Sequence, residues 1–219
     1  MYGSAGSTLP LAPALHGYSL GLPLSMLALL ASLSAFQAPS TPGSFRSYLL
    51  GDWTVRKAVN YKSGGVSGRF SGDASFSMLE ANKPHLWSYI AYKESGTFVP
   101  NQSEDFPSLE TRNRLLYDFS ESKTNVYYDE LSEGERSDTE TVVSQASFLY
   151  ALEPRGEGTL AIESTSAGEF SYSGSIDVEA PNAFIITWRV HGPGQDGEIA
   201  SLFKRAGIEE DGTVDVDAV

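Results

Sequence analysis

After about residue 47, the sequence alternates between apolar and polar residues with a period of two. In the run from Gly68 to Phe76, small or apolar residues at even positions alternate with Arg, Ser and Asp at odd positions. This period places alternate side chains on opposite faces of a β-strand, so each such run predicts a strand with one buried and one solvated face. The same pattern recurs at 170–178 and 184–190.

The whole pattern predicts about ten short strands and no long helix. Further strands are expected at 52–61, 86–98, 111–119, 124–129, 146–152, 158–164 and 198–205. Gly, Pro, Asn and Asp lie between these runs, as they do in turns. Such a chain folds as an antiparallel barrel or sandwich. Glycines on the expected inner face (Gly68, Gly72 and Gly174) favour a barrel, because strongly coiled strands need bare backbone.

Composition excludes several function classes. The 219 residues fit one domain, and the net charge of −13 argues against a nucleic-acid partner, whose phosphates require a basic face. The absence of cysteine excludes disulfides, thiolate catalysis and cysteine-ligated metals. The three histidines are widely spaced, so no metal site and no cofactor are expected. No Gly-x-Ser-x-Gly motif is present either, and no catalytic residue can be assigned.

The first 45 residues contain no acidic residue and include an apolar stretch from Leu20 to Leu33. These 14 residues are short for a membrane-spanning helix, which needs about 20 residues, but suit the core of a signal peptide. We therefore expect a signal peptide over 1–35, with an uncleaved anchor as the alternative. Contact with a membrane is then expected through this leader only.

The motif that follows, Ser34-Ala35-Phe36-Gln37-Ala38-Pro39, resembles the bipartite leader of plastid proteins in algae with red-derived secondary plastids. The resemblance implies cleavage between Ala35 and Phe36 and delivery to the plastid through the secretory route. Plain secretion is the alternative. The expected organisation is then a transit-like linker at 36–46, a barrel domain at 47–206 and an acidic disordered tail at 207–219.

Two positions at the ends of the predicted barrel resemble lipocalins, of the calycin class. Gly51-Asp52-Trp53 opens the first strand as Gly-x-Trp, and Arg205 ends the last strand. In lipocalins, an arginine at the end of the last strand covers such a tryptophan at the closed end of the barrel. The resemblance implies an up-and-down antiparallel barrel of about 8–10 strands, closed by a Trp53–Arg205 pair. A stacked pair of this kind contributes roughly 0.5–2 kcal/mol.

Several motifs in the same order resemble domain-of-unknown-function family 6314. They are Leu50–Trp53, Gly68–Phe76, Tyr172–Gly174, Trp188–Pro193 and Ser201–Arg205. The resemblance implies a lipocalin-like barrel and brings no established activity. Residues 164–168 lack the His and Cys that members carry before the Tyr-x-Gly motif, so no histidine-centred chemistry is expected.

Glu94 is the polar residue of greatest interest, because it lies in phase with Ile90, Tyr92 and Phe98 on an apolar face. A carboxyl group there must be paired, hydrogen-bonded or protonated. The hypotheses are a polar anchor for a ligand, a general acid, or a buried structural pair. The candidate partners are Arg112, Arg114, Tyr128 and Tyr172. The residues expected to bind a ligand are Glu94, Tyr92, Tyr117, Tyr128, Tyr172 and Trp188.

Three functions are compatible with this sequence. The first is binding of a small hydrophobic molecule inside the barrel: a pigment, a tetrapyrrole or an oxidised lipid. The others are a plastid enzyme of lyase or isomerase type, and a non-catalytic assembly or scaffold protein whose barrel is filled by its own side chains. Binding or catalysis needs a cavity of about 300 Å³ or more. Within such a cavity, an unpartnered Glu94 favours an enzyme, whereas a Glu94 paired with arginine favours binding or structure.

Overall fold

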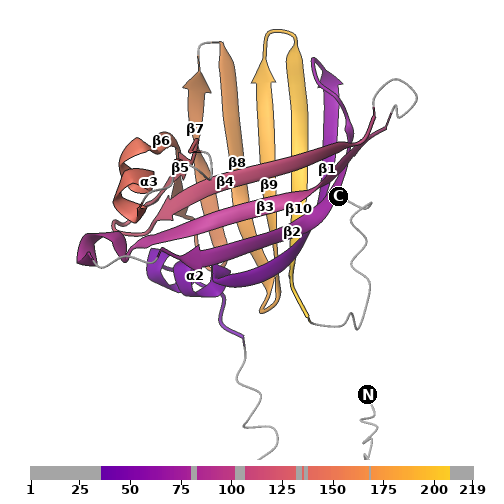
Figure 1. Cartoon of the computed structure of the whole chain (residues 1–219). Coiled ribbons are helices and arrows are strands. Elements are labelled where there is room, and N and C mark those ends of the chain that lie inside the picture. The colour runs from indigo at the N-terminus through magenta and orange to yellow at the C-terminus, as the bar shows by residue number, and fades with distance from the viewer. Residues whose placement is uncertain are drawn as a thin grey trace, which may run out of the picture. The chain divides into compact units, whose positions relative to one another are not determined.

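A computed structural model describes residues 36–79, 83–101, 107–131, 135, 138–167 and 169–207 of the chain, without the side chains of 163–167. This part folds into a closed antiparallel barrel of ten strands (Figure 1). Each strand pairs with the next one along the chain, and the first pairs with the last. The alternation predicted an antiparallel barrel or sandwich, and the lipocalin resemblance implied an all-β up-and-down barrel, which is confirmed.

The strands all occur where the sequence predicts them, with ends that move by a few residues. They are β1 (Gly51–Ser63), β2 (Gly68–Met78), β3 (Tyr89–Pro100), β4 (Leu109–Asp118), β5 (Thr124–Tyr128), β6 (Ser147–Pro154), β7 (Thr159–Ala167), β8 (Phe170–Ala180), β9 (Ala183–Gly192) and β10 (Gln195–Arg205). β3 begins later than expected because Pro84–Leu86 forms a single 3₁₀ turn, η1. Proline suits the first turn of a helix, where its missing N–H costs nothing.

Helix α2 (Pro42–Leu49) begins in the segment 36–46, for which a linker was expected. Its start is well specified, because Thr41 and Ser44 form a reciprocal capping box and Pro42 occupies the first turn. Phe45 and Leu49 lie one turn apart on one face, and both are fully buried in the barrel core. α2 thus covers the end of the barrel at which β1 begins (Figure 1).

Helix α3 (Thr139–Gln145) lies outside every run for which the alternation predicts a strand, at the end of an acid-rich segment. The Asp138 side chain caps the helix by accepting a hydrogen bond of 2.9 Å from the Thr141 N–H. Val142 is buried with Ala91 and Leu116, on the outer face of the barrel. The sequence gives little indication of this helix, because a single apolar residue packs against the outside of the sheet and many of the residues around it are acidic.

Within the described ranges, no helix is both long enough and apolar enough to cross a membrane. The expected signal peptide at 1–35 lies outside the described residues, as does the acidic tail after Gly207.

One glycine pair allows the barrel wall to coil where β2 and β3 meet. Gly72 and Gly96 are register partners on the inner face. A Cβ atom at Gly72 would lie 2.2 Å from the carbonyl oxygen of Ser95 and 2.9 Å from the ring of Phe70. Gly72, whose inward position was interpreted as a sign of barrel curvature, therefore also makes room for an aromatic ring to lie along the wall.

Candidate functional site

The end of the barrel under α2 is closed by the pair that the lipocalin resemblance implies. The Arg205 guanidinium lies 4.0 Å from the centroid of the Trp53 ring. It also donates hydrogen bonds to the carbonyl oxygens of Leu50, at 2.7 Å, and Tyr48, at 2.6 Å. The indole N–H of Trp53 donates to the carbonyl of Leu49 at 2.8 Å. These contacts tie α2 to the start of β1 and the end of β10, which is a structural role.

In the middle of the barrel, Glu94 forms a buried ion pair with Lys57. The Lys57 Nζ lies 2.5 Å from Glu94 Oε1, and the Tyr92 hydroxyl donates to the other carboxylate oxygen. The Glu94 side chain is only 4% exposed, whereas that of Lys57 is 20% exposed. Lys57 also lies over the ring of Phe70, 4.8 Å from its centroid.

The partners that the sequence analysis assigned to Glu94 were wrong. In the β3–β4 ladder Glu94 is opposite Asn113, so Arg112 and Arg114 on either side project to the outer face. The true partner comes from β1, which is not adjacent to β3 in the barrel. A signal was present, because Lys57 is in phase with Trp53 and its inward direction follows from the same alternation.

A set of buried tyrosine hydroxyls surrounds this pair. Burial raises the pKa of Tyr92 and Tyr117 well above the ordinary value, and the negative charge of Glu94 raises both further. Burial likewise raises the pKa of Tyr150, whose hydroxyl is hydrogen-bonded to that of Tyr117. All three are neutral at physiological pH and act as hydrogen-bonding groups rather than as bases.

The opposite half of the barrel encloses a cavity of about 750 Å³. Its lining residues are Tyr61, Phe148, Leu149, Tyr150, Tyr172, Trp188, Arg189, Val190, Gln195, Gly197 and Ile199. The β1–β10 register places Trp53 opposite Arg205 at one end of the ladder and Tyr61 opposite Gly197 near the other. The cavity is therefore at the end of the barrel away from α2, and it exceeds the minimum size for a ligand site.

The predicted site residues divide between the cavity and the core. Tyr172 and Trp188 line the cavity. Glu94, Tyr92 and Tyr117 lie deeper, among buried side chains.

Tyr128 lies neither in the core nor in the cavity lining. It is 42% exposed, because β5 ends there. The sequence analysis missed Tyr150, whose ring lies 4.6 Å from that of Trp188. The alternation along the strand already indicates that Tyr150 points inward, because it is in phase with the apolar Leu152.

Exposed residues of β6 border the cavity, beyond the described ladder between β6 and β7. Their described ladder joins only Leu152–Pro154 to Leu160–Ile162, although both strands continue beyond it toward the cavity. Phe148 and Leu149, on the part of β6 beyond this ladder, line the cavity and are 60% and 43% exposed. This apolar rim is a suitable entrance for a hydrophobic molecule.

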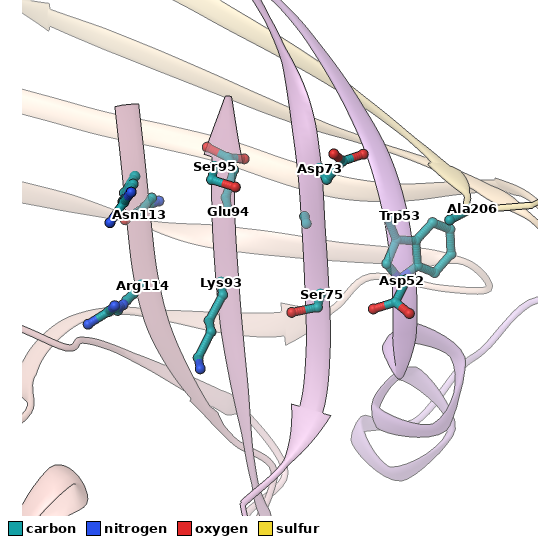
Figure 2. A pocket seen from close by; sticks show the side chains of 12 residues that line it. Asp52, Trp53, Asp73, Ser75, Lys93, Glu94, Ser95, Asn113, Arg114 and Ala206 are labelled. Atoms are coloured by element: carbon teal, nitrogen blue, oxygen red, sulfur yellow. The ribbon is translucent and has the colours of Figure 1, made fainter. Parts of the chain in front are cut away.

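A second hollow, of about 480 Å³, lies over β1 to β4 on the outer face of the barrel (Figure 2). Asp52 and Asp73 come from β1 and β2, and Lys93 and Arg114 come from β3 and β4. Short side chains such as Ser75 form the floor between them. These groups are strand residues in outward phase, so the hollow is a polar surface feature rather than an apolar pocket. No group of three metal-ligating side chains occurs in the part of the chain that the structure describes.

The sequence matches the DUF6314 family, a family of unknown function, over residues 49–205. The chain belongs to this family. The match spans the barrel from the end of α2 to the arginine of the closing pair, so the family resemblance read from the motifs is confirmed. No curated protein matches the chain significantly.

Among solved structures, the S-type phycobiliprotein lyase CPES from Guillardia theta has a similar fold. It superposes with a TM-score of 0.51 at 10% identity, covering 77% of this chain and 94% of the lyase. A DUF3598-family protein of unknown function from Nostoc punctiforme aligns with a TM-score of 0.45 at 11% identity, over 74% of this chain and 49% of that protein. At these identities the likeness to the lyase establishes a shared barrel fold.

Proposed function

We propose that this DUF6314 barrel binds a small hydrophobic molecule in the cavity between Tyr61 and Trp188. The observation that carries the proposal is the cavity itself: about 750 Å³, walled mainly by aromatic and aliphatic side chains. A pocket of this size suits a flat or extended apolar molecule, and the hydroxyls of Tyr61, Tyr150 and Tyr172 supply a few hydrogen-bonding groups. Pigments, tetrapyrroles and oxidised lipids all have this character.

The fold similarity to a phycobiliprotein lyase supports a barrel suited to pigment chemistry only by analogy. Within the chain itself, the pairing of Glu94 favours binding over catalysis. Its carboxylate has both an ammonium and a phenol as partners, so it is not the unsatisfied group expected of a general acid. The scaffold alternative required a filled barrel, and the half of the barrel away from α2 is hollow.

Tryptophan fluorescence tests the binding proposal directly. Trp188 lines the cavity, whereas Trp87 is 56% exposed and lies outside it. We expect a linear tetrapyrrole, a carotenoid or an oxidised fatty acid to quench the emission of the full chain. The quenching should be largely lost in Trp188→Phe and kept in Trp87→Phe. Equal quenching in both variants would place the ligand elsewhere and contradict the proposal.

Native mass spectrometry and absorption spectra of the protein purified from its own cells identify the ligand class. Binding predicts a co-purifying species that is released unchanged. The lyase or isomerase alternative predicts instead that an added ligand is recovered in altered form. A clean mass without ligand, in protein that stays colourless after incubation with plastid extract, would count against a pigment carrier.

We further propose that the leader directs this barrel through the secretory route to a plastid. The support is the sequence motif around Phe36, together with the position of Phe36 itself. Its ring lies 6.3 Å from that of Tyr48 in α2, so the barrel unit includes residues from this point onward. N-terminal sequencing of the mature protein tests the cleavage site: a chain beginning at Phe36 supports it, and a chain that retains residues 1–35 contradicts it.

A further inference from the structure

The Lys57–Glu94 pair is exposed unequally, and the more accessible partner is the cation. Glu94 is almost completely buried, with both oxygens occupied by Lys57 and Tyr92. The Lys57 side chain is 20% exposed, and its ammonium group has three N–H donors. Among the described residues, Glu94 is the acceptor of one of them. Of the two charged groups in the pair, the more exposed one is therefore the hydrogen-bond donor and not the carboxylate.

Register places this pair one inward layer below the cavity. Lys57 is opposite Ser201 on β10, and the next inward residue of β10, Ile199, lines the cavity. Across the barrel, Tyr150 lines the cavity and is hydrogen-bonded to Tyr117.

The ring of Tyr117 is 6.3 Å from that of Tyr92, which donates to Glu94. The pair is thus connected to residues of the cavity lining on two sides of the barrel.

Charge balance restricts what can bind at this depth. Lys57 and Glu94 together carry no net charge. A ligand carboxylate placed beside them would put two anions against one cation in a site shielded from water, which is costly. A neutral carbonyl oxygen accepts a hydrogen bond from the ammonium without adding charge, and bonds to charged donors are the stronger ones.

We propose that the molecule held in the cavity presents a neutral carbonyl acceptor, a ketone or an amide, to Lys57, and that Glu94 selects against a carboxylate at that position. This inference rests on the proposed function and narrows its ligand class. The ligand has an apolar body with a carbonyl at its deep end, and any acidic group it carries lies toward the mouth of the barrel.

Competition among three matched probes tests the inference. Dodecan-2-one, dodecanoic acid and dodecane share an apolar chain and differ at one end. Displacement of Nile red from the full chain at neutral pH measures their relative affinities. We expect the ketone to bind about tenfold more tightly than either the acid or the hydrocarbon, the value of one good hydrogen bond to a charged donor.

Glu94→Gln should reverse the preference for the ketone over the acid, because Lys57 then carries an unbalanced positive charge. In that variant the acid is expected to gain about tenfold and to bind better than the ketone. Glu110→Gln makes the same charge change at an exposed site on β4 and should leave the ranking unchanged. The double variant Lys57→Met with Glu94→Gln removes both charges, so no charge is left unpaired, and should bind all three probes equally.

The outcomes separate this inference from the proposed function. If Nile red and all three probes fail to bind the folded wild-type chain, the proposed function is wrong and this inference falls with it. Equal affinities for ketone, acid and hydrocarbon would keep the binding function and overturn the role of Lys57. A wild-type preference for the acid, or an unchanged ranking in Glu94→Gln, would overturn the selection by Glu94.

Discussion

At the end covered by α2 the barrel is filled by aromatic side chains, whereas at the other end the same strands surround a cavity. The β9–β10 ladder shows how the two halves arise. Phe184 and Phe203 are opposite each other near α2, with their rings stacked 4.4 Å apart. Farther along, the inward residues of β10 are Ser201, Ile199 and Gly197, two of which are small. Small side chains on one strand leave the space that large ones fill elsewhere, so one barrel combines a folding core with a ligand site.

The largest expected contrast is between Trp53, which is fully buried in the filled half, and Trp188, which is half-buried beside the cavity. Trp53→Ala should lower the free energy of unfolding by about 3–5 kcal/mol, because Trp53 is fully buried against Phe184 and Arg205. Trp188→Ala removes a ring that already borders empty space, so its cost should be about half as large. Urea denaturation measures both. Equal losses would mean that the two halves do not differ in packing.

The next largest effect on stability is expected at the Lys57–Glu94 ion pair, which lies between the two halves of the barrel. Lys57→Met leaves the Glu94 carboxylate buried without its ammonium partner, and we expect a loss of about 3 kcal/mol. Adding Glu94→Gln to this variant should recover most of the loss, since no unpaired charge then remains. The same denaturation series checks this. A double variant no more stable than Lys57→Met would show that packing, and not charge, decides stability at this layer.

Alkaline pH should weaken the tyrosine contacts of the packed half. Burial raises the pKa of Tyr48 from 10.0 to about 12, so the unfolded chain releases this proton at lower pH than the folded chain. The contribution to stability is therefore complete below about pH 10 and is lost as the pH rises toward about 12. Circular dichroism and tyrosine absorbance at 295 nm should show exposed tyrosines ionising first. Tyr48→Phe should be less sensitive to pH, and unchanged sensitivity would contradict this assignment.

The smallest expected effect on stability is at the rim of the hollow half. Phe148 is 60% exposed, so Phe148→Ser should change the free energy of unfolding by no more than about 0.5 kcal/mol. It should nevertheless slow the entry of a hydrophobic ligand, measured by stopped-flow fluorescence of Trp188. An exposed residue outside the cavity, as in Val66→Ser, is the matched control. A large loss of stability, or unchanged binding kinetics, would count against Phe148 as part of the entrance.

Most of the architecture was predictable because alternation reports directly on which side of a strand a residue lies. It predicted every strand and the inward direction of Glu94. Contacts between strands that are not neighbours were not predictable in the same way. The Lys57–Glu94 pair spans β1 and β3, and its geometry depends on how the wall coils at Gly72 and Gly96. Helix α2 was missed because the composition of its segment resembles a transit peptide, although Thr41 and Pro42 already formed a helix start.

The sequence by itself therefore determined the barrel, its strand order and the pair that closes one end, since these follow from local periodicity and from motifs at the chain positions that carry them. Only the tertiary structure decided that the barrel is half filled, that Lys57 is the more exposed partner of its buried ion pair, and that Phe148 and Leu149 border the cavity. These properties depend on the volumes and directions of side chains brought together from distant strands. No single stretch of sequence contains that information.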